Sequence, residues 1–298
     1  MSDPPTTPAG LPAAEIEIDE DLVRALLRAQ HPDLAELRLI LTAIGWDNVT
    51  YRLGDRLAVR LPRIRAGSEL LRHEQTWLPV LAGRLPIRVP VPERLGEPEG
   101  EMFPWRWSVV PWIPGRSAEH ALPDPTQAAT FGRFLAALHH PAPDDFPRND
   151  WRGIRLTNVT DRVDRQLHDV ADEVPLAALR DHWQTALAAR PDPLITCIHG
   201  DLHPKNVVVD NGRLAAVLDW GDMTAGDPAT DVAAAWMLFP VPAHPYLWKA
   251  YGTIPPSTMD RAKGWAVFFG LTLLEAGLAG DGPFEAIGRA TLERLCTP

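Results

Sequence analysis

Cysteine is nearly absent from this sequence, which contains only Cys197 and Cys296. Two cysteines cannot form the disulfide framework of a small secreted domain, and these two lack the spacing of zinc ligands. Lysine is almost as scarce: apart from Lys205, Lys249 and Lys263, all the Lys and Arg positions are arginines. The sequence therefore excludes a disulfide-stabilised protein and a cysteine-ligated metal protein.

Long hydrophobic runs and an excess of positive charge are also missing. The longest apolar stretch, around Trp265–Leu274, is too short to cross a bilayer. The first dozen residues lack the basic start and the apolar core of a secretory signal. The net charge of −10 argues against a nucleic-acid partner. We expect a cytoplasmic protein with no nucleic-acid partner and no membrane partner.

The residues that carry chemistry are concentrated in one stretch. The apolar run Leu194–Ile198 leads into His-Gly-Asp-Leu-His-Pro-Lys-Asn, in which the aspartate is Asp201 and the last residue is Asn206. A β-branched run follows, then Asp-Asn-Gly, then a second apolar run that stops at Asp219. Asn-Gly between two apolar runs predicts a hairpin. This hairpin would bring the side chains of Asp201, Asn206 and Asp219 close together at one of its ends.

These three side chains suit phosphoryl transfer. Mg²⁺ prefers hard oxygen ligands and takes one or two carboxylates together with phosphate oxygens and water. A further carboxylate must orient the attacking hydroxyl and accept its proton. The alternative is that Asp201 and Asn206 are turn residues and that Asp219 caps a helix. The order His-Gly-Asp-x-x-x-x-Asn and then Asp-x-Gly, with strands on both sides, favours catalysis.

The motif at 199–206, together with Asp219-Trp220-Gly221, resembles the aminoglycoside phosphotransferase family, which includes macrolide phosphotransferases. By this resemblance, Asp201 is the catalytic base, and Asn206 and Asp219 hold Mg²⁺. The resemblance also implies that His199 braces the loop. A further match, at residues 226–233, implies that Asp231 supports the catalytic loop from a helix.

The family resemblance implies an α+β, bilobal, protein-kinase-like fold, with a small β-rich N-terminal lobe and a larger, mainly helical C-terminal lobe. We expect a disordered tail at 1–14, a nucleotide-binding lobe at 15–110, a hinge at 111–115 and a helical lobe with the acceptor site at 116–298. Within the helical lobe, apolar runs predict long helices at 230–239 and 259–279.

The nucleotide, ATP or GTP, is expected to bind the N-terminal lobe. The expected nucleotide-binding residues are Asn48, Tyr51, Arg60, Glu74, Val110, Pro111 and Ile113. Arg60 stands where relatives more often have a lysine, and Glu74, on a helix predicted at 66–83, would pair with it. The alternative for Asn48 and Tyr51 is that they belong to a plain hairpin. The alternative for Arg60 is a surface arginine, and the alternative for Glu74 is a solvated helical glutamate. Because Pro111 has no N–H, Ile113 would supply a donor to the nucleobase.

The acceptor is expected to be a small hydroxylated molecule. Its candidate ligands are His203, Asp222, Asp227, Trp236 and Glu275. Acidic residues favour an aminoglycoside-type antibiotic, whereas the acid-free, aromatic segment at 232–259 would suit a macrolide.

Other functions stay open. A metabolic kinase that resembles the choline or homoserine enzymes, and a non-catalytic nucleotide-binding module, are both alternatives. A protein acceptor is disfavoured because no activation segment of useful length lies between Gly221 and Gly226. The sequence leaves the oligomeric state open.

Overall fold

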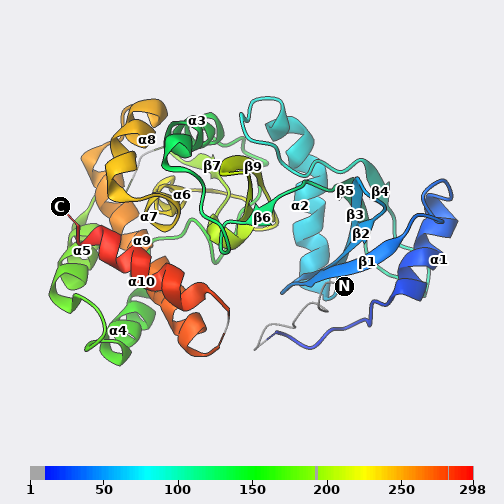
Figure 1. Ribbon diagram of the computed structural model, residues 1–298, viewed down its shortest axis with the longest axis horizontal. Coiled ribbons are helices and arrows are strands. Elements are labelled where there is room, and N and C mark those ends of the chain that lie inside the picture. Colours follow the sequence, from blue (N-terminus) through cyan, green and yellow to red (C-terminus); the bar gives the residue numbers. More distant parts are fainter. Residues whose placement is uncertain (1–10, 192–193, 281, 298) are drawn as a thin grey trace. The chain divides into compact units, whose positions relative to one another are not determined.

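The computed structural model describes residues 11–191, 194–280 and 282–297. The chain forms two compact units (Figure 1). The N-terminal unit comprises Met1–Gly83 and Val89–Ile113, and the C-terminal unit comprises Arg84–Arg88 and Pro114–Pro298. The fold is α+β, as predicted, because the first unit is built on a β-sheet and the second is mainly helical.

The N-terminal unit contains a five-stranded antiparallel sheet with the strand order β1-β2-β3-β5-β4. Its strands are β1 (Leu39–Ile44), β2 (Asn48–Leu53), β3 (Leu57–Pro62), β4 (Arg94–Gly96) and β5 (Trp107–Pro111). Gly54 lies in the turn between β2 and β3 with φ of +58°. Alternating side chains point to opposite faces of this sheet, so the register decides which residues can meet.

Two helices cover the two faces of this sheet (Figure 1). On one face, α1 (Glu20–Gln30) joins a buried apolar cluster that includes Tyr51 and Trp107. On the other face, α2 (Arg65–Ala82) is tied to β5, because Gln75 Nε2 donates to Trp107 O and to Ser108 Oγ, each at 3.0 Å. The helix predicted at 66–83 is confirmed.

The C-terminal unit is built around one long buried helix, α9 (Pro256–Leu278). The helices α4, α5, α6, α7 and α10 contact it. The other helices of this unit are α3 (Ala128–Leu138), α4 (Thr160–Asp169), α5 (Leu176–Ala188), α6 (Ala229–Val232), α7 (Ala234–Leu238), α8 (His244–Tyr251) and α10 (Phe284–Leu295). Four short 3₁₀ segments in the described residues are η1 (Pro125–Gln127), η2 (Leu156–Val159), η3 (Pro204–Asn206) and η4 (Val241–Ala243).

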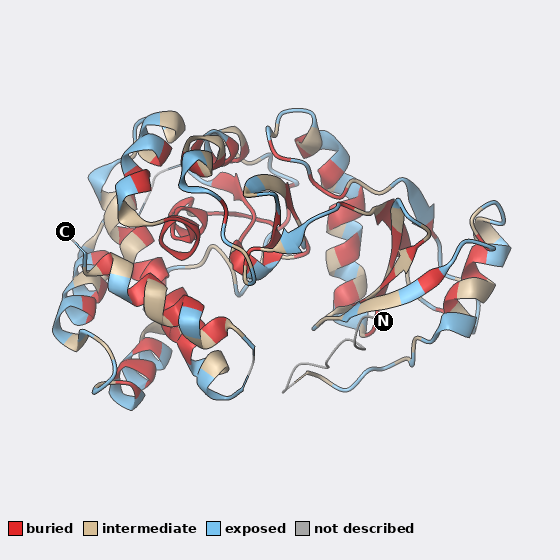
Figure 2. Cartoon of the chain, viewed as in Figure 1, coloured by how far each residue is buried: buried red, intermediate tan, exposed pale blue. Residues whose placement is uncertain are grey.

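The prediction of one helix at 230–239 was wrong. The segment forms two short helices, α6 and α7, and the Trp236 N–H donates to Ala233 O instead of continuing the α-helical pattern. All residues from 229 to 239 are buried (Figure 2). The apolar character of this segment therefore reflects core packing on every side, which also removes the amphipathic pattern that marks a helix in sequence.

Short strands frame the loop at residues 199–206. Strand β7 (Thr196–Ile198) pairs antiparallel with β10 (Thr224–Gly226). Strands β8 (Val207–Asp210) and β9 (Arg213–Val217) form the predicted hairpin, and β6 (Arg116–Ser117) pairs with β8. In the turn, Asn211 and Gly212 have φ of +48° and +77°, the conformation that Asn-Gly favours.

Across the described ranges 11–191, 194–280 and 282–297, no helix combines the length and the apolar character needed to cross a membrane.

Candidate functional site

The loop between β7 and β8, with the end of the β8–β9 hairpin, gathers the three residues singled out by the motif. Asn206 Nδ2 donates to Asp201 O at 2.9 Å, and the Leu218 N–H donates to Asn206 O at 2.8 Å. Asp219 follows Leu218 directly, so it leaves the hairpin beside Asn206. Asp201 keeps 21% of its side chain exposed and Asp219 is exposed, so both carboxylates reach solvent.

His199 holds the two halves of this arrangement together. Its Nδ1 accepts from the Asp201 N–H at 3.2 Å, and its Nε2 lies 2.9 Å from Leu218 O. Because Nδ1 is an acceptor, the proton is assigned to Nε2, which donates to the carbonyl that precedes Asp219. The fully buried imidazole therefore links the backbone of the first aspartate to the backbone beside the second.

Asp231 supports the same loop from α6. Its Oδ2 accepts from the His199 N–H at 2.7 Å, and its Oδ1 accepts from the Gly200 N–H at 2.9 Å. Behind it, His139 Nε2 lies 3.3 Å from Oδ2, and His139 Nδ1 lies 2.9 Å from Tyr251 Oη. A fully buried carboxylate needs such partners, and two of them belong to the loop it holds.

Asp219 has a backbone conformation that few side chains adopt. Its φ is +58°, in the left-handed region, where Asp is among the better tolerated residues. Trp220 then enters the core, fully buried, and its Nε1 donates to Val217 O at 3.0 Å. The buried indole fixes the chain immediately after the turn, so the Asp219 side chain stays at the open end of the hairpin.

Arg152 is the main residue that the sequence reasoning missed. Its Nη2 lies 2.9 Å from Asp201 Oδ1, and its Nε donates to Asp222 Oδ2 at 3.1 Å. Asn149 Nδ2 donates to the other oxygen of Asp222 at 2.9 Å. Burial alone would raise the pKa of Asp201, but Arg152 and then His203 hold it well below its usual range. Asp201 is therefore ionised throughout the neutral range.

Tertiary packing brings Arg152 to this place. The antiparallel pairing of β7 with β10 sets Thr224 opposite Ile198, so the chain ends that hold Asp201 and Asp222 emerge together. Thr224 Oγ1 accepts from the Asn149 N–H at 3.0 Å. Gly153, with φ of +63°, lies so close to β10 that an added Cβ would be 3.0 Å from Gly226 Cα. No local pattern in residues 149–153 indicates this contact; only the Asn-Asp-Trp-Arg-Gly turn composition is visible in sequence.

Among the described residues, His203 is the only predicted acceptor ligand that contacts Asp201 directly. Its Nδ1 accepts from the Lys205 N–H at 3.3 Å, which leaves Nε2 to donate toward Asp201 Oδ2 at 3.4 Å. The first residue of α10, Phe284, lies edge-on to the imidazole with ring centroids 6.4 Å apart.

Asp227 and Trp236, two of the other predicted acceptor ligands, have structural partners instead. Asp227 is bound by Arg261, with Nη2 3.0 Å from Oδ1, and the same oxygen accepts from the Ala229 N–H at 3.0 Å. Trp236 is buried against His244 and Trp248. Asp227 is therefore held by Arg261, and the Trp236 side chain is buried in the core.

Glu275 lies on α9 and accepts from Gln166 Nε2 at 2.6 Å. Arg162 Nη2 is 3.8 Å from the same carboxylate oxygen. Among the described residues, no hydrogen bond or ion pair connects Glu275 to Asp201, so Glu275 belongs to a separate cluster between α4 and α9.

In the N-terminal unit, Arg60 and Glu74 form the expected ion pair between Nη1 and Oε2. Only 11% of the Arg60 side chain and 2% of the Glu74 side chain are exposed. Asn48 and Val110 lie on the same face of the sheet as Arg60, since their cross-strand partners keep the same parity. The pair is thus a buried feature of the sheet face that α2 covers.

Tyr51 lies on the opposite face of that sheet, in the apolar cluster with α1, and its Oη donates to Ile18 O at 3.2 Å. Its expected contact with a nucleotide is therefore not supported: the period of two along β2 turns Tyr51 away from Arg60. At the end of β5, the Trp112 N–H donates to Arg56 O at 2.7 Å. The Ile113 N–H, by contrast, meets no acceptor among the described residues.

Residues 38–265 match the family model described as "Phosphotransferase enzyme family". The chain belongs to this family. Among curated proteins, it is 28% identical over 166 residues to the aminoglycoside 3'-phosphotransferase of Escherichia coli, covering 52% of this chain and 56% of the relative. It is 30% identical over 200 residues to the viomycin phosphotransferase of Streptomyces vinaceus, covering 61% and 67%. The chain thus spans between about half and two thirds of the length of these relatives.

Solved structures of the family share the fold. The GDP and kanamycin complex of APH(2")-IIia has a TM-score of 0.63 at 20% identity, over 92% of this chain and 98% of that one. The macrolide 2'-phosphotransferase of Brachybacterium faecium has a TM-score of 0.58 at 23% identity, over the same shares of 92% and 98%. The kinase-like fold expected from the motif is confirmed by these likenesses.

The donor set at the hairpin end fits the Mg²⁺ ion expected for a phosphotransferase of this family. Asn206 donates through Nδ2 to Asp201 O, so its Oδ1 is the atom that would bind the ion. Asp219 adds one exposed carboxylate. No cluster of three or more His, Cys, Asp or Glu side chains suited to a metal occurs in the described residues. A site with only two protein oxygens suits Mg²⁺, which keeps water and phosphate ligands, better than it suits Zn²⁺ or Ca²⁺.

Proposed function

We propose that this protein is a Mg²⁺-dependent phosphotransferase that moves the γ-phosphoryl group of ATP or GTP to a hydroxyl group of a small molecule. The observation that carries the proposal is the convergence of Asp201, Asn206 and Asp219 at one end of the β8–β9 hairpin. Membership of the phosphotransferase family supports the same reaction class.

In this proposal, Asp201 accepts a hydrogen bond from the acceptor hydroxyl and orients its oxygen toward the γ-phosphorus. It takes the hydroxyl proton as the new P–O bond forms and the bond to the leaving nucleoside diphosphate breaks. Asn206 and Asp219 would hold Mg²⁺, which supplies positive charge to the phosphate oxygens when it is bound. His199 and Asp231 do not touch the reactants; they hold the loop so that the carboxylate stays in place.

The nucleotide would bind residues of the N-terminal unit. Arg60 would contact phosphate oxygens while Glu74 holds its guanidinium, as the buried pair between them suggests. Arginine keeps the positive charge of the more usual lysine and offers two parallel donors to a phosphate. The Ile113 N–H would donate to the nucleobase, since no acceptor in the described chain uses it.

For the acceptor, we propose only a small hydroxylated compound. The aminoglycoside expectation relied partly on Asp222 and Asp227, and both are paired with arginines. The macrolide expectation relied on the aromatic segment at 232–259, where Trp236 is buried. Because relatives are named for aminoglycosides, viomycin and homoserine, an acceptor screen should include each of these compounds.

The test is a nucleotide-consumption screen with Mg·ATP and Mg·GTP against aminoglycosides, macrolides, viomycin, amino alcohols and hydroxy acids. We expect acceptor-dependent release of nucleoside diphosphate and a phosphorylated product. Asp201→Asn should lower kcat by about 10³-fold, because only the proton-accepting step is lost. Its nucleotide Kd should change by less than about threefold, because Asp201 is not assigned to the nucleotide.

Asp210→Asn is the matched control, because Asp210 is exposed in the turn at the other end of the same hairpin. Normal turnover in Asp201→Asn would refute the role of this carboxylate. Nucleotide binding without transfer to any compound would instead favour a non-catalytic binding module.

A further inference from the structure

The guanidinium of Arg152 is placed at Asp201 with part of its hydrogen-bonding capacity unused. Nη2 faces Asp201 and Nε donates to Asp222. Among the residues that the structure describes, none accepts a hydrogen bond from Nη1. With 28% of its side chain exposed, Arg152 can present this third nitrogen to a ligand.

Asp222, the second aspartate that Arg152 contacts, already has partners for both of its carboxylate oxygens. Asp222 accepts from Arg152 through one carboxylate oxygen and from Asn149 through the other. A carboxylate held in this way is a poor partner for a ligand ammonium, which would have to displace a hydrogen bond of the guanidinium. The ammonium would also lie beside a permanent positive charge, and like charges that meet at a binding site select against a ligand.

The backbone that carries Arg152 is held firmly. Asn149 Oδ1 accepts from the Trp151 N–H at 2.8 Å and from the Arg152 N–H at 3.2 Å, an Asx turn that fixes both residues. The Trp151 side chain, next in sequence to Arg152, is 81% exposed. A large apolar ring displayed on an anchored loop offers a stacking surface for a flat part of a ligand.

Resting on the proposed function, we infer that Arg152 determines the charge class of the acceptor. The reacting hydroxyl lies next to a carboxylate or carbonyl oxygen that binds Nη1 of Arg152, and an ammonium at that position is rejected. Trp151 contacts an apolar or aromatic part of the same molecule. The acceptor class is therefore a hydroxy acid or a hydroxylated carbonyl compound, not a molecule whose reacting hydroxyl neighbours an amine.

Three probes with one skeleton test this inference: mandelate, mandelamide and 2-amino-1-phenylethanol. Each carries a phenyl ring and a hydroxyl on the same carbon, and they differ in whether the neighbouring group is an anion, an amide or an ammonium. Binding is measured by tryptophan fluorescence with Mg²⁺ and a non-hydrolysable nucleotide, and transfer is measured separately by nucleotide consumption. We expect mandelate and mandelamide to bind at least about tenfold more tightly than the amine.

Variants show whether Arg152 causes this order. Arg152→Gln should reduce the preference to less than about threefold, and Arg152→Glu should reverse it. Arg152→Lys keeps the charge and should keep the order. Arg155→Gln is the matched control, because Arg155 is an exposed arginine three residues away, and it should leave the order unchanged. Circular dichroism verifies that each variant is folded.

A preference for the amine in the wild type, an order that persists in Arg152→Gln, or no detectable binding of any probe at millimolar concentration overturns the inference. These results are separable from failure of the proposed function. If the probes bind in the expected order and no compound is ever phosphorylated, the charge selection stands and the phosphotransferase activity falls. If acceptors are phosphorylated at rates independent of Arg152, the activity stands and the charge selection falls.

Discussion

Two clusters in the C-terminal unit each pair an arginine with aspartate, but the two arginines differ in how far they are exposed. Arg261 is 6% exposed and engages all three guanidinium nitrogens, through Asp227 and through Arg190 O. Arg152 is 28% exposed and engages two of its nitrogens, with Asp201 and Asp222. The first cluster is closed and the second is open, which separates a structural pair from a candidate binding group.

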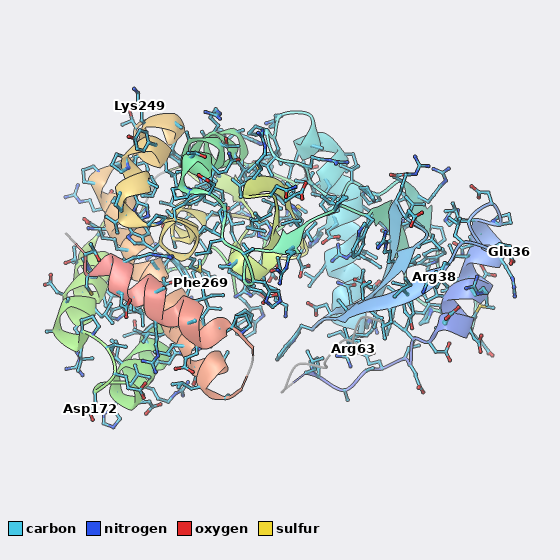
Figure 3. The ribbon with its side chains drawn as sticks, in the orientation of Figure 1. Glu36, Arg38, Arg63, Asp172, Lys249 and Phe269 are labelled. Atoms are coloured by element: carbon cyan, nitrogen blue, oxygen red, sulfur yellow. The ribbon has the colours of Figure 1, made fainter. Side chains whose placement is uncertain are left out.

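The contrast shows why the acidic residues of this chain could not be assigned from their position in the sequence. Asp222 and Asp227 are five positions apart, yet one belongs to the open cluster and the other to the closed one. Asp172, by contrast, is exposed at the turn between α4 and α5, on the outside of the unit (Figure 3). The role of each carboxylate can be inferred only from the residues that it contacts in the folded protein.

The largest effect that would distinguish the clusters is on stability. Arg261→Met should lower the free energy of unfolding by about 3 kcal/mol, because it leaves the mostly buried Asp227 carboxylate without its counter-ion. Denaturant unfolding followed by circular dichroism measures this change.

The double variant Arg261→Met with Asp227→Asn is the control, and it should recover part of the loss because the unpaired charge is gone. A loss below about 1 kcal/mol in the single variant would mean that the pair contributes little and that the closed cluster is not structural.

A smaller effect is expected at the open cluster. Arg152→Gln should cost less than about 1 kcal/mol in the same unfolding experiment, since a partly exposed arginine pair contributes little to stability. If this variant proves as destabilising as Arg261→Met, the two clusters are equivalent, Arg152 is a structural brace, and its assignment to the acceptor fails.

The smallest effect concerns acid. The pKa of Asp201 is lowered mainly by Arg152, against the opposing effect of burial, so the ionised carboxylate favours the folded state at neutral pH. This stabilisation is fully present above the pKa that Asp201 has in the unfolded chain. It is lost as the pH falls through the lower pKa that Asp201 has in the folded protein. The difference in stability between wild type and Arg152→Gln should therefore be largest near pH 7 and should shrink below about pH 4. Unfolding curves at pH 7, 5 and 3 measure it, and a difference that grows on acidification would contradict this account.

Local chemistry allowed much of the site to be predicted. The Asn211-Gly212 turn predicted the β8–β9 hairpin, and that hairpin by itself brings Asp219 next to Asn206. The resemblance to the kinase-like family predicted the ion pair between Arg60 and Glu74. The motif spacing does not say which face of a strand meets the core, and Tyr51 lies in the apolar cluster with α1.

Arg152 and Trp236 show the limit of local patterns. Arg152 reaches Asp201 because β7 pairs with β10 and the segment at 147–153 crosses that pair, a contact between positions 49 residues apart. Trp236 was read as an acceptor wall, but it lies in α7, which is buried on all sides. The residue type alone does not distinguish an apolar side chain that lines a binding site from one that packs in the core.

The sequence by itself determined which groups can perform the chemistry and the hairpin that gathers them, because turn geometry and side-chain alternation act over a few residues. Tertiary structure decided which of these groups are free to act. It closed Asp227 with Arg261 and set Arg152 against Asp201, since the charge beside a carboxylate depends on chain segments that meet only when the protein folds.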